Sequence, residues 1–251
     1  MDTWQVPKVV NINVITIHSV LFSLLIISSL QDDIIELGGI KFKVVEKGNS
    51  DRRYIWLHGD EQTARMALEH HMKLNLGTAF FIQGETRETD LFDGIIDPNR
   101  IFSSTGAEAN IQKYNRSWSR LKKQEALEWI NRERDAFLES IFPKNGGLLV
   151  ALHNNFKGYN VNREIQKSDS VSIKKDQNPR DFFICTDRTD FEALARSPFN
   201  VVLQEKLIQK DDGSLSWAAI RNGVRYVNIE VRLGWLSQQK KMLNYLENNL
   251  K

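Results

Sequence analysis

Two residues in the first third of the chain have the types and spacing of metal ligands. His58 follows the apolar run of residues 54–57, and Glu61 comes three positions later, just before the helix-forming stretch of residues 63–69. A histidine at a strand end and a glutamate in the first turn of a helix can aim at one point, and both are usual ligands of a catalytic zinc ion. The pair alone is more typical of a surface turn in which Glu61 stabilises the helix N-terminus. The metal hypothesis therefore depends on a third ligand.

A second histidine repeats this arrangement. His153 follows the apolar run of residues 148–152, which is typical of a buried strand. Strand, helix and strand within residues 53–82 form a βαβ unit, which predicts a parallel sheet with its site at the carboxyl ends of the strands. His58 and His153 are then expected at one edge of the sheet. With Glu61 they make a ligand set that leaves a fourth position for water, although His153 alone would be interpreted as a capped strand end.

The elements expected around these residues alternate between strands and helices. Periodicity and turn residues predict strands at 34–37, 40–45, 53–57, 78–82, 148–152, 181–186, 200–203 and 226–232. They predict helices at 63–76, 118–142, 190–196 and 236–250. Residues 84–109 lack periodicity and are expected to be a long loop. We predict a single α/β domain with a mixed, mainly parallel β-sheet flanked by helices.

Composition excludes several classes of function. The 251 residues include 34 basic and 32 acidic residues, a net charge of +2, which gives no electrostatic case for binding nucleic acid. The single Cys185 excludes an intramolecular disulfide and a cysteine-based metal cluster, and its apolar neighbours favour a buried structural thiol. His70 and His71 are adjacent and do not share a helix face, so packing or surface roles are expected for them.

An apolar segment, residues 9–30, precedes the expected domain. Its densest part has the length of a signal-peptide core and is followed by small residues suited to cleavage. Polar residues within it argue against a transmembrane helix, although its length would just cross a bilayer. We expect residues 1–31 to be a signal peptide, with a membrane anchor or an internal segment as alternatives.

The localisation expected depends on that segment. A signal peptide predicts an exported protein, periplasmic or secreted, and an anchor predicts a membrane-anchored one. In either case membrane contact is expected only through residues 9–30, and residues 32–251 are expected to form a zinc peptidase-like catalytic domain.

Four motifs, in this order, resemble the zinc metallocarboxypeptidase superfamily, which also contains the succinylglutamate desuccinylase and aspartoacylase type of amide hydrolase. They are His-Gly-Asp-Glu-Gln-Thr-Ala at 58–64, Asp-Pro-Asn-Arg-Ile-Phe at 97–102, Leu-His at 152–153 and Ile-Glu-Val-Arg at 229–232. The resemblance implies that His58, Glu61 and His153 bind one zinc ion per chain. It also implies that Asn99 and Arg100 hold a substrate carboxylate, a role that suits the planar guanidinium fork.

The resemblance implies two catalytic residues as well. Glu230 matches the general base, which takes a proton from water and later gives it to the leaving nitrogen. Arg87, upstream of the Asn-Arg pair, is the candidate for stabilising the developing oxyanion.

The sequence departs from the family pattern in ways that leave the substrate open. Pro98 replaces a common leucine, and serines follow Phe102 where the family often has Pro-Gly. The usual substrate-side tyrosine has no assigned counterpart, although Tyr159 and Tyr226 are available.

We therefore expect a zinc-dependent amide-bond hydrolase, a metallopeptidase of the carboxypeptidase type, acting next to a free carboxylate of a peptide or acyl-amino-acid substrate. One alternative is an N-acyl amino acid deacylase of the succinylglutamate desuccinylase/aspartoacylase type. Another is an inactive binding module that keeps the same fold.

Overall fold

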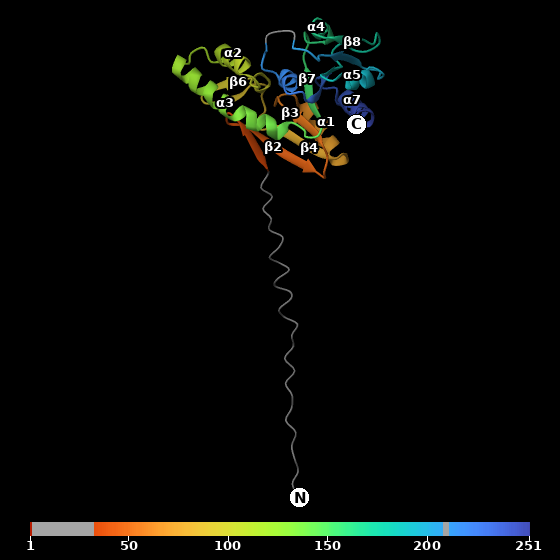
Figure 1. Ribbon diagram of the computed structural model, residues 1–251, viewed down its shortest axis with the longest axis horizontal. Coiled ribbons are helices and arrows are strands. Elements are labelled where there is room, and N and C mark those ends of the chain that lie inside the picture. Colours follow the sequence, from red (N-terminus) through yellow and green to blue (C-terminus); the bar gives the residue numbers. More distant parts are fainter. Residues whose placement is uncertain (2–32, 208–210) are drawn as a thin grey trace. The chain divides into compact units, whose positions relative to one another are not determined.

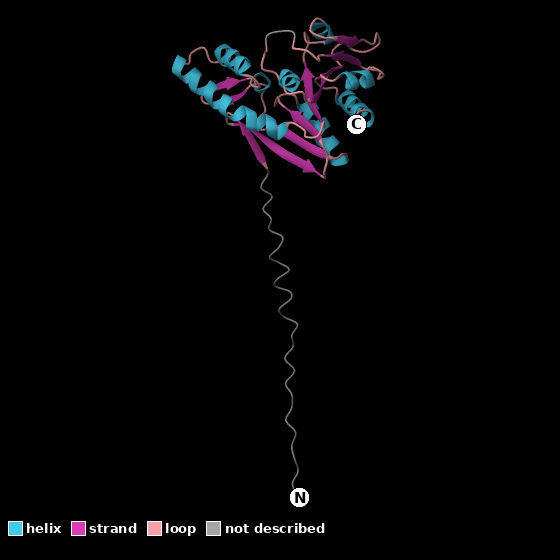
Figure 2. Cartoon of the chain, viewed as in Figure 1, coloured by secondary structure: helices cyan, strands magenta, loops and turns pink. Residues whose placement is uncertain are grey.

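One mixed β-sheet forms the centre of the fold. The computed structural model describes residue 1, residues 33–207 and residues 211–251, in which nine strands pair in the order β1-β2-β4-β3-β7-β11-β9-β10-β8 (Figures 1 and 2). The strands are β1 Ile34–Leu37, β2 Ile40–Lys47, β3 Arg52–Trp56, β4 Gly77–Ile82, β7 Leu148–Asn155, β8 Ser170–Ser172, β9 Phe182–Cys185, β10 Asn200–Leu203 and β11 Arg225–Arg232.

The central strands β4, β3, β7 and β11 are parallel to one another. Antiparallel pairings occur toward the two edges, so that β2, β9 and β10 run opposite to the other six strands. This confirms the predicted mixed, mainly parallel sheet. The central strands are buried along almost their whole length, which explains why they read as nearly continuous apolar runs in the sequence.

Seven α-helices flank the sheet within the described residues. They are α1 Gln62–Leu74, α2 Ser104–Tyr114, α3 Arg120–Ile141, α4 Val161–Ile165, α5 Arg188–Leu194, α6 Leu215–Arg221 and α7 Leu236–Asn249. α1 and α5 both pack on α7, and α7 packs on β11. α4 packs on β10, on the face of the sheet opposite to α5. There Val161 belongs to a small apolar cluster with residues of β9 and β10, separate from the main core.

The loop expected at residues 84–109 contains regular structure, so that prediction was wrong. It holds a hairpin, β5 (Thr89–Leu91) and β6 (Gly94–Ile96), then a 3₁₀ turn η1 (Pro98–Arg100) and the first half of α2. β5 and β6 pair only with each other among the described strands, and α2 begins at a serine cap, where the Ser103 hydroxyl accepts from the amide of Gly106. Neither feature produces an apolar repeat long enough to detect.

Two strand ends differ from the prediction around the histidines. β3 ends at Trp56, two residues before His58, and β7 continues two residues past His153 to Asn155. Both histidines nevertheless lie near the carboxyl ends of neighbouring parallel strands. The short elements α4, β8 and α6 were not predicted, because pieces of this length depend on tertiary packing rather than local propensity.

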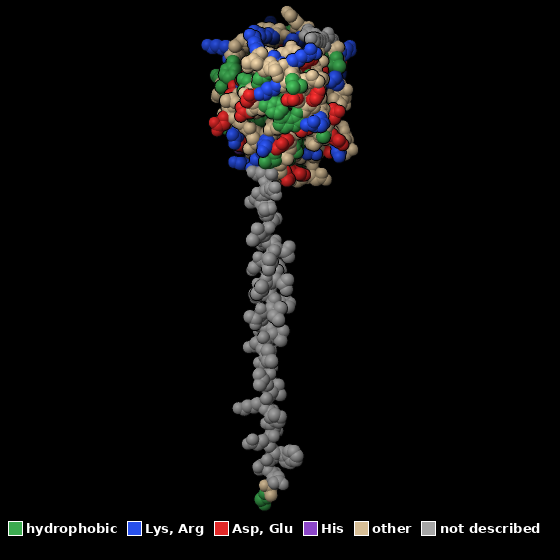
Figure 3. Space-filling view, turned by 90° about the vertical axis from the view of Figure 1, so that its left-hand side faces the viewer, with side chains coloured by type: hydrophobic (Ala, Val, Ile, Leu, Met, Phe, Trp, Pro, Cys, Tyr) green, Lys and Arg blue, Asp and Glu red, His purple; other side chains and the backbone are tan. Residues whose placement is uncertain are grey.

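Residues 33–251 form one compact unit. The predicted signal peptide or anchor at residues 1–31 and the apolar segment 9–30 lie outside the described residues. Among the described helices, none is both long and apolar enough to cross a bilayer. On the face drawn in Figure 3, basic and acidic side chains are intermingled around a small hydrophobic area.

Candidate metal centre and its cavity

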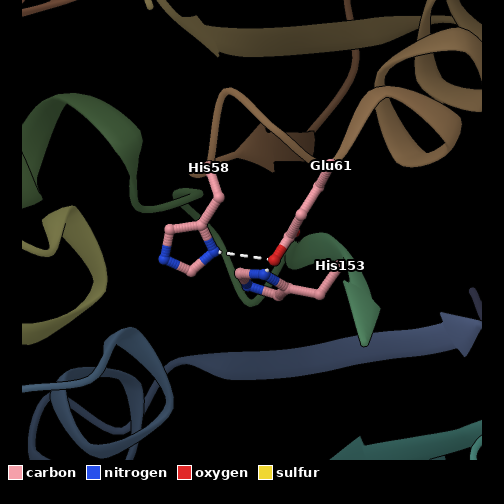
Figure 4. A group of neighbouring side chains, drawn as sticks. All are labelled: His58, Glu61 and His153. Atoms are coloured by element: carbon pink, nitrogen blue, oxygen red, sulfur yellow. Dashed lines mark hydrogen bonds and ion pairs between the residues drawn. The ribbon is translucent and has the colours of Figure 1, made fainter. Parts of the chain in front are cut away.

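His58, Glu61 and His153 converge at the carboxyl end of the sheet (Figure 4). The Nδ1 atoms of the two histidines lie 2.9 Å from different oxygens of Glu61, and the ring centroids are 5.1 Å apart. All three side chains are buried. One potential ligand atom from each residue lies within 4.8 Å of the others, so the group can hold a metal ion.

The donor set fits zinc. Two imidazole nitrogens and one carboxylate oxygen are the ligands of many catalytic zinc sites. Atoms bound tetrahedrally at zinc's usual bond lengths lie roughly 3.3 Å apart, close to the 2.9 Å separations seen around Glu61. A small movement of buried side chains would therefore place the ion between them.

Asp97 supports this group and was given no role by the sequence. Its Oδ1 lies 2.9 Å from His58 Nε2, the nitrogen that faces away from Glu61, and the same oxygen accepts from the amide of Asn99. A carboxylate on the outer nitrogen holds the ring's orientation and leaves Nδ1 as the lone-pair donor. Burial acts to raise the pKa of Asp97, but its hydrogen bond and charge interaction with His58 lower it well below its usual range. The available signal was the position of Asp97, directly ahead of the Asn-Arg motif.

The two acidic groups also affect His58. Burial disfavours its charged form, yet the attraction of Glu61 and the hydrogen bond to Asp97 outweigh burial and raise the pKa of His58 to about 9. Around Glu61 the balance is similar, since burial acts to raise its pKa, whereas the charges of His153 and His58 lower it strongly. The group is thus a compact cluster of complementary charges.

Local structure places Glu61 and Arg87 together. A Cβ atom at Gly59 would lie 2.5 Å from the carbonyl oxygen of Gly84, so only glycine allows the two loops to approach this closely. The amide of Gly59 donates to the carbonyl of Thr86 at 2.9 Å. Arg87 then donates from Nη1 to Glu61 Oε1 at 2.9 Å. The candidate oxyanion residue thus contacts a proposed metal ligand.

Asn154 fixes the helix that carries Glu61. Its Oδ1 accepts from the amide of Ala64 in the first turn of α1, at 2.8 Å, and its Nδ2 donates to Gln239 of α7 at 2.9 Å. The side chain is buried and alternates in direction with its neighbour His153 along β7. β7 therefore places the candidate ligand His153 on one face of the sheet and Asn154, which positions α1, on the other.

Glu230 lies beside His153 in the parallel pairing of β11 and β7. It is buried, and its two oxygens accept from Asn155 Nδ2 and Asn228 Nδ2, both at 3.1 Å. Burial raises the pKa of Glu230 above its ordinary value, with the charge of Glu61 adding to this and the charge of His153 acting against it. A carboxylate with a raised pKa can take and return a proton near neutrality.

Asn99 and Arg100 lie in η1 at the rim. Asn99 Oδ1 accepts from the amide of Leu215 at 2.9 Å, which leaves its amide nitrogen as the donor that it can offer. Arg100 is partly exposed, and its nearest acid is Asp212 at 3.9 Å. Its Nη1 donates to the carbonyl of Asn99 at 2.5 Å, and the other nitrogens of the guanidinium keep donors available for an anion.

All seven residues predicted for the site line one cavity of about 460 Å³. They are His58, Glu61, Arg87, Asn99, Arg100, His153 and Glu230. Tyr159 and Tyr226, the unassigned tyrosines, line it too. Outside the cavity, His70 is exposed, His71 packs against Tyr54, and Cys185 is a buried free cysteine, which agrees with the surface and packing roles predicted for them.

Comparisons with known proteins give the following. No protein-family model matches the chain, and no curated protein matches its sequence. Among solved structures the chain is similar to a crystal structure from Shewanella frigidimarina NCIMB 400, described provisionally as a succinylglutamate desuccinylase/aspartoacylase. The two are 12% identical, with a TM-score of 0.38 over 84% of this chain and 67% of that chain. This likeness assigns no activity to the chain.

Proposed function

We propose that this protein is a zinc-dependent amide-bond hydrolase of the carboxypeptidase type, acting next to a free carboxylate of its substrate. The observation that supports this is the single cavity in which a His-Glu-His group, a buried glutamate and an Asn-Arg pair meet. These are the parts that such a reaction needs: metal ligands, a base and a carboxylate anchor.

His58, Glu61 and His153 would hold the metal, with Asp97 orienting His58. A bound zinc ion supplies Lewis acidity, lowering the pKa of water and polarising a carbonyl. Glu230 takes the proton from the attacking water and returns it to the leaving nitrogen. The amides of Asn155 and Asn228 hold both of its oxygens, so that its carboxylate keeps one orientation.

Arg100 and Asn99 bind the terminal carboxylate, since the guanidinium offers parallel donors and the amide nitrogen adds another. Arg87 stabilises negative charge that develops on the carbonyl oxygen. In the structure this guanidinium bonds to Glu61. It therefore already lies beside the proposed metal ligands.

Metal analysis of the purified protein tests the centre. We expect about one zinc ion per chain, lost in His153→Ala and kept in His70→Ala, which changes an exposed histidine of α1. Glu230→Gln should keep zinc and lower kcat at least about 100-fold, because the base is gone. A protein that binds no zinc, or a fully active Glu230→Gln variant, would exclude the proposal.

A comparison of two substrate classes distinguishes the carboxypeptidase, the deacylase and the inactive binding module. Blocked dipeptides with a free carboxyl terminus should be hydrolysed faster than N-acylated amino acids if the protein is a carboxypeptidase. The opposite order would indicate a deacylase. Stoichiometric zinc with no turnover on either set would indicate a binding module.

A further inference from the structure

The cavity extends past Glu230 along the sheet. Asn228 lies two residues before Glu230 on β11 and therefore points to the same face. It pairs with Ile184 on β9, and Ile184 pairs with Val202 on β10. Asn228 and Ile184 line the cavity together with Gln204, which follows β10. This row of residues forms an inner wall, of which the proposed chemistry uses only the amide nitrogen of Asn228.

Asn228 carries an unpaired acceptor on that wall. Its Nδ2 donates to Glu230 Oε1 at 3.1 Å, whereas its Oδ1 is buried with no hydrogen-bond partner in the described structure. The residue is 7% exposed. The opposite orientation of the Asn228 side-chain amide would place its oxygen against the Glu230 carboxylate, and the two would repel each other. While Glu230 is ionised, Asn228 Oδ1 therefore faces away from Glu230. A buried acceptor without a partner costs free energy, which a ligand's donor would recover.

Glu164 of α4 adds a second acceptor to the same cavity. Its side chain is 7% exposed, with Oε2 accepting from Gln204 at 2.8 Å and Oε1 lying 3.6 Å from the ammonium of Lys167. The Lys167 side chain is 40% exposed and can swing into water. A donor from a ligand can then replace it at Glu164.

The basic residues of the cavity are placed differently. Lys157 and Arg163 are exposed, and Arg100 is partly exposed. These cations suit the substrate's carboxylate, whereas the buried acceptors Asn228 and Glu164 suit a hydrogen-bond donor. The cavity lining therefore combines exposed cations with buried acceptors, and the two kinds of group prefer opposite ligand groups.

We propose that Asn228 and Glu164 select substrates whose terminal residue has a side chain ending in a hydrogen-bond donor, a primary amide or an ammonium group. This inference rests on the proposed hydrolase function, because it places the terminal residue in the inner part of the cavity. An aliphatic side chain would leave Asn228 Oδ1 unpaired, and a carboxylate would be repelled by Glu164.

The test uses the full-length, zinc-loaded protein and four benzoylglycyl dipeptides that end in lysine, glutamine, leucine or glutamate. We expect kcat/KM for lysine and glutamine to exceed that for leucine and glutamate by at least about tenfold. Equal rates for leucine and lysine would overturn the inference while leaving the hydrolase intact.

For each variant, the ratio of the kcat/KM values for two substrates is compared with that of the wild type. A general loss of activity lowers both values alike and leaves their ratio unchanged. Asn228→Ala should bring the glutamine-to-leucine ratio roughly tenfold closer to one. Glu164→Gln should lower the lysine-to-glutamine ratio, and Lys167→Met should raise it by freeing Glu164. Glu139→Gln, an exposed acid of α3, should change neither ratio. Unchanged ratios in Asn228→Ala and Glu164→Gln would contradict the assignment.

Calorimetry with the free amino acids makes the test independent of turnover. Lysine and glutamine should bind the zinc-loaded protein more tightly than leucine and glutamate. If no dipeptide is cleaved, the hydrolase proposal fails, and the order of binding still decides the inference. Leucine binding as tightly as lysine would refute it.

Discussion

At the scale of single residues, the site depends on groups that orient other groups. Asp97 holds His58, and Asn155 and Asn228 hold Glu230. None of these three is a predicted ligand, base or anchor. A change in one of them should therefore tune the site without removing its chemistry.

Asp97→Asn should weaken zinc binding. The amide oxygen can still accept from His58 Nε2 and the Asn99 amide, so the shape is kept and only the charge is lost. We expect zinc affinity to fall roughly tenfold, measured by competition with a chelator. Asp93→Asn, in the exposed β5–β6 turn, is the control. Unchanged affinity in Asp97→Asn would mean that Asp97 does not support the centre.

Arg100→Met should affect only substrates with a free carboxylate. Its guanidinium lines the cavity, donates to the carbonyl of the adjacent Asn99 at 2.5 Å and lies 3.9 Å from Asp212. We expect kcat/KM for a blocked dipeptide to fall about 10–100-fold, and the already slow cleavage of its C-terminal amide to stay the same. Arg120→Met, at an exposed position of α3, should match the wild type. An equal loss on both substrates would point to a structural role.

At the scale of elements, two loops must touch for the site to form. The loop after β3 carries His58, Gly59 and Glu61, and the loop after β4 carries Gly84 and Arg87. Neighbouring parallel strands bring their ends together. Gly59 then allows the close backbone contact.

Gly59→Ala should separate these loops. The new methyl would clash with the backbone of Gly84, at 2.5 Å, and displace Arg87 from Glu61. We expect a loss of about 1–3 kcal/mol in the free energy of unfolding, measured by denaturant titration, together with reduced turnover. Gly84→Ala is a matched control, because a Cβ there meets no atom within 4 Å. Equal stability of the two variants would argue against the tight contact.

At the scale of the whole molecule, the C-terminal helix α7 links the central strand β3 to α1. Glu247 of α7 accepts from the hydroxyl of Tyr54 on β3 at 2.7 Å and lies 3.5 Å from His71 on α1. Burial acts to raise the pKa of Glu247, but its polar contact with His71 and its hydrogen bond from Tyr54 outweigh burial and lower it below its ordinary 4.5. None of these three residues lines the cavity.

Glu247→Gln should destabilise the protein at neutral pH and have less effect in acid. Because the pKa is lowered in the folded state, ionised Glu247 contributes stability above pH 4.5, and this is lost as pH falls below 4.5 through the folded value. We expect about 1–3 kcal/mol at pH 7, from urea unfolding, and a smaller difference at pH 3. Glu139→Gln should show no such dependence. A constant difference across pH would exclude an ionic contribution.

The sequence by itself determined the central strands, the long helices and the candidate ligands. His58 and Glu61 are three residues apart in a strand–turn–helix unit, so local structure largely decides how they face each other. The buried strands were visible as apolar runs because both faces of a parallel sheet are covered. The position of His153 in such a run was enough to place it near the same edge.

Only the tertiary structure decided which distant groups meet. The pairing of β11 with β7 puts Glu230 beside His153 and Asn155, and the packing of η1 brings Asp97 to His58. Strand register and loop packing depend on contacts between segments far apart in the chain, which local pattern does not encode. For the same reason the short elements α4 and α6 and the unpaired acceptor of Asn228 emerged only with the fold. Local chemistry thus names the ligands, and long-range pairing assembles the cavity around them.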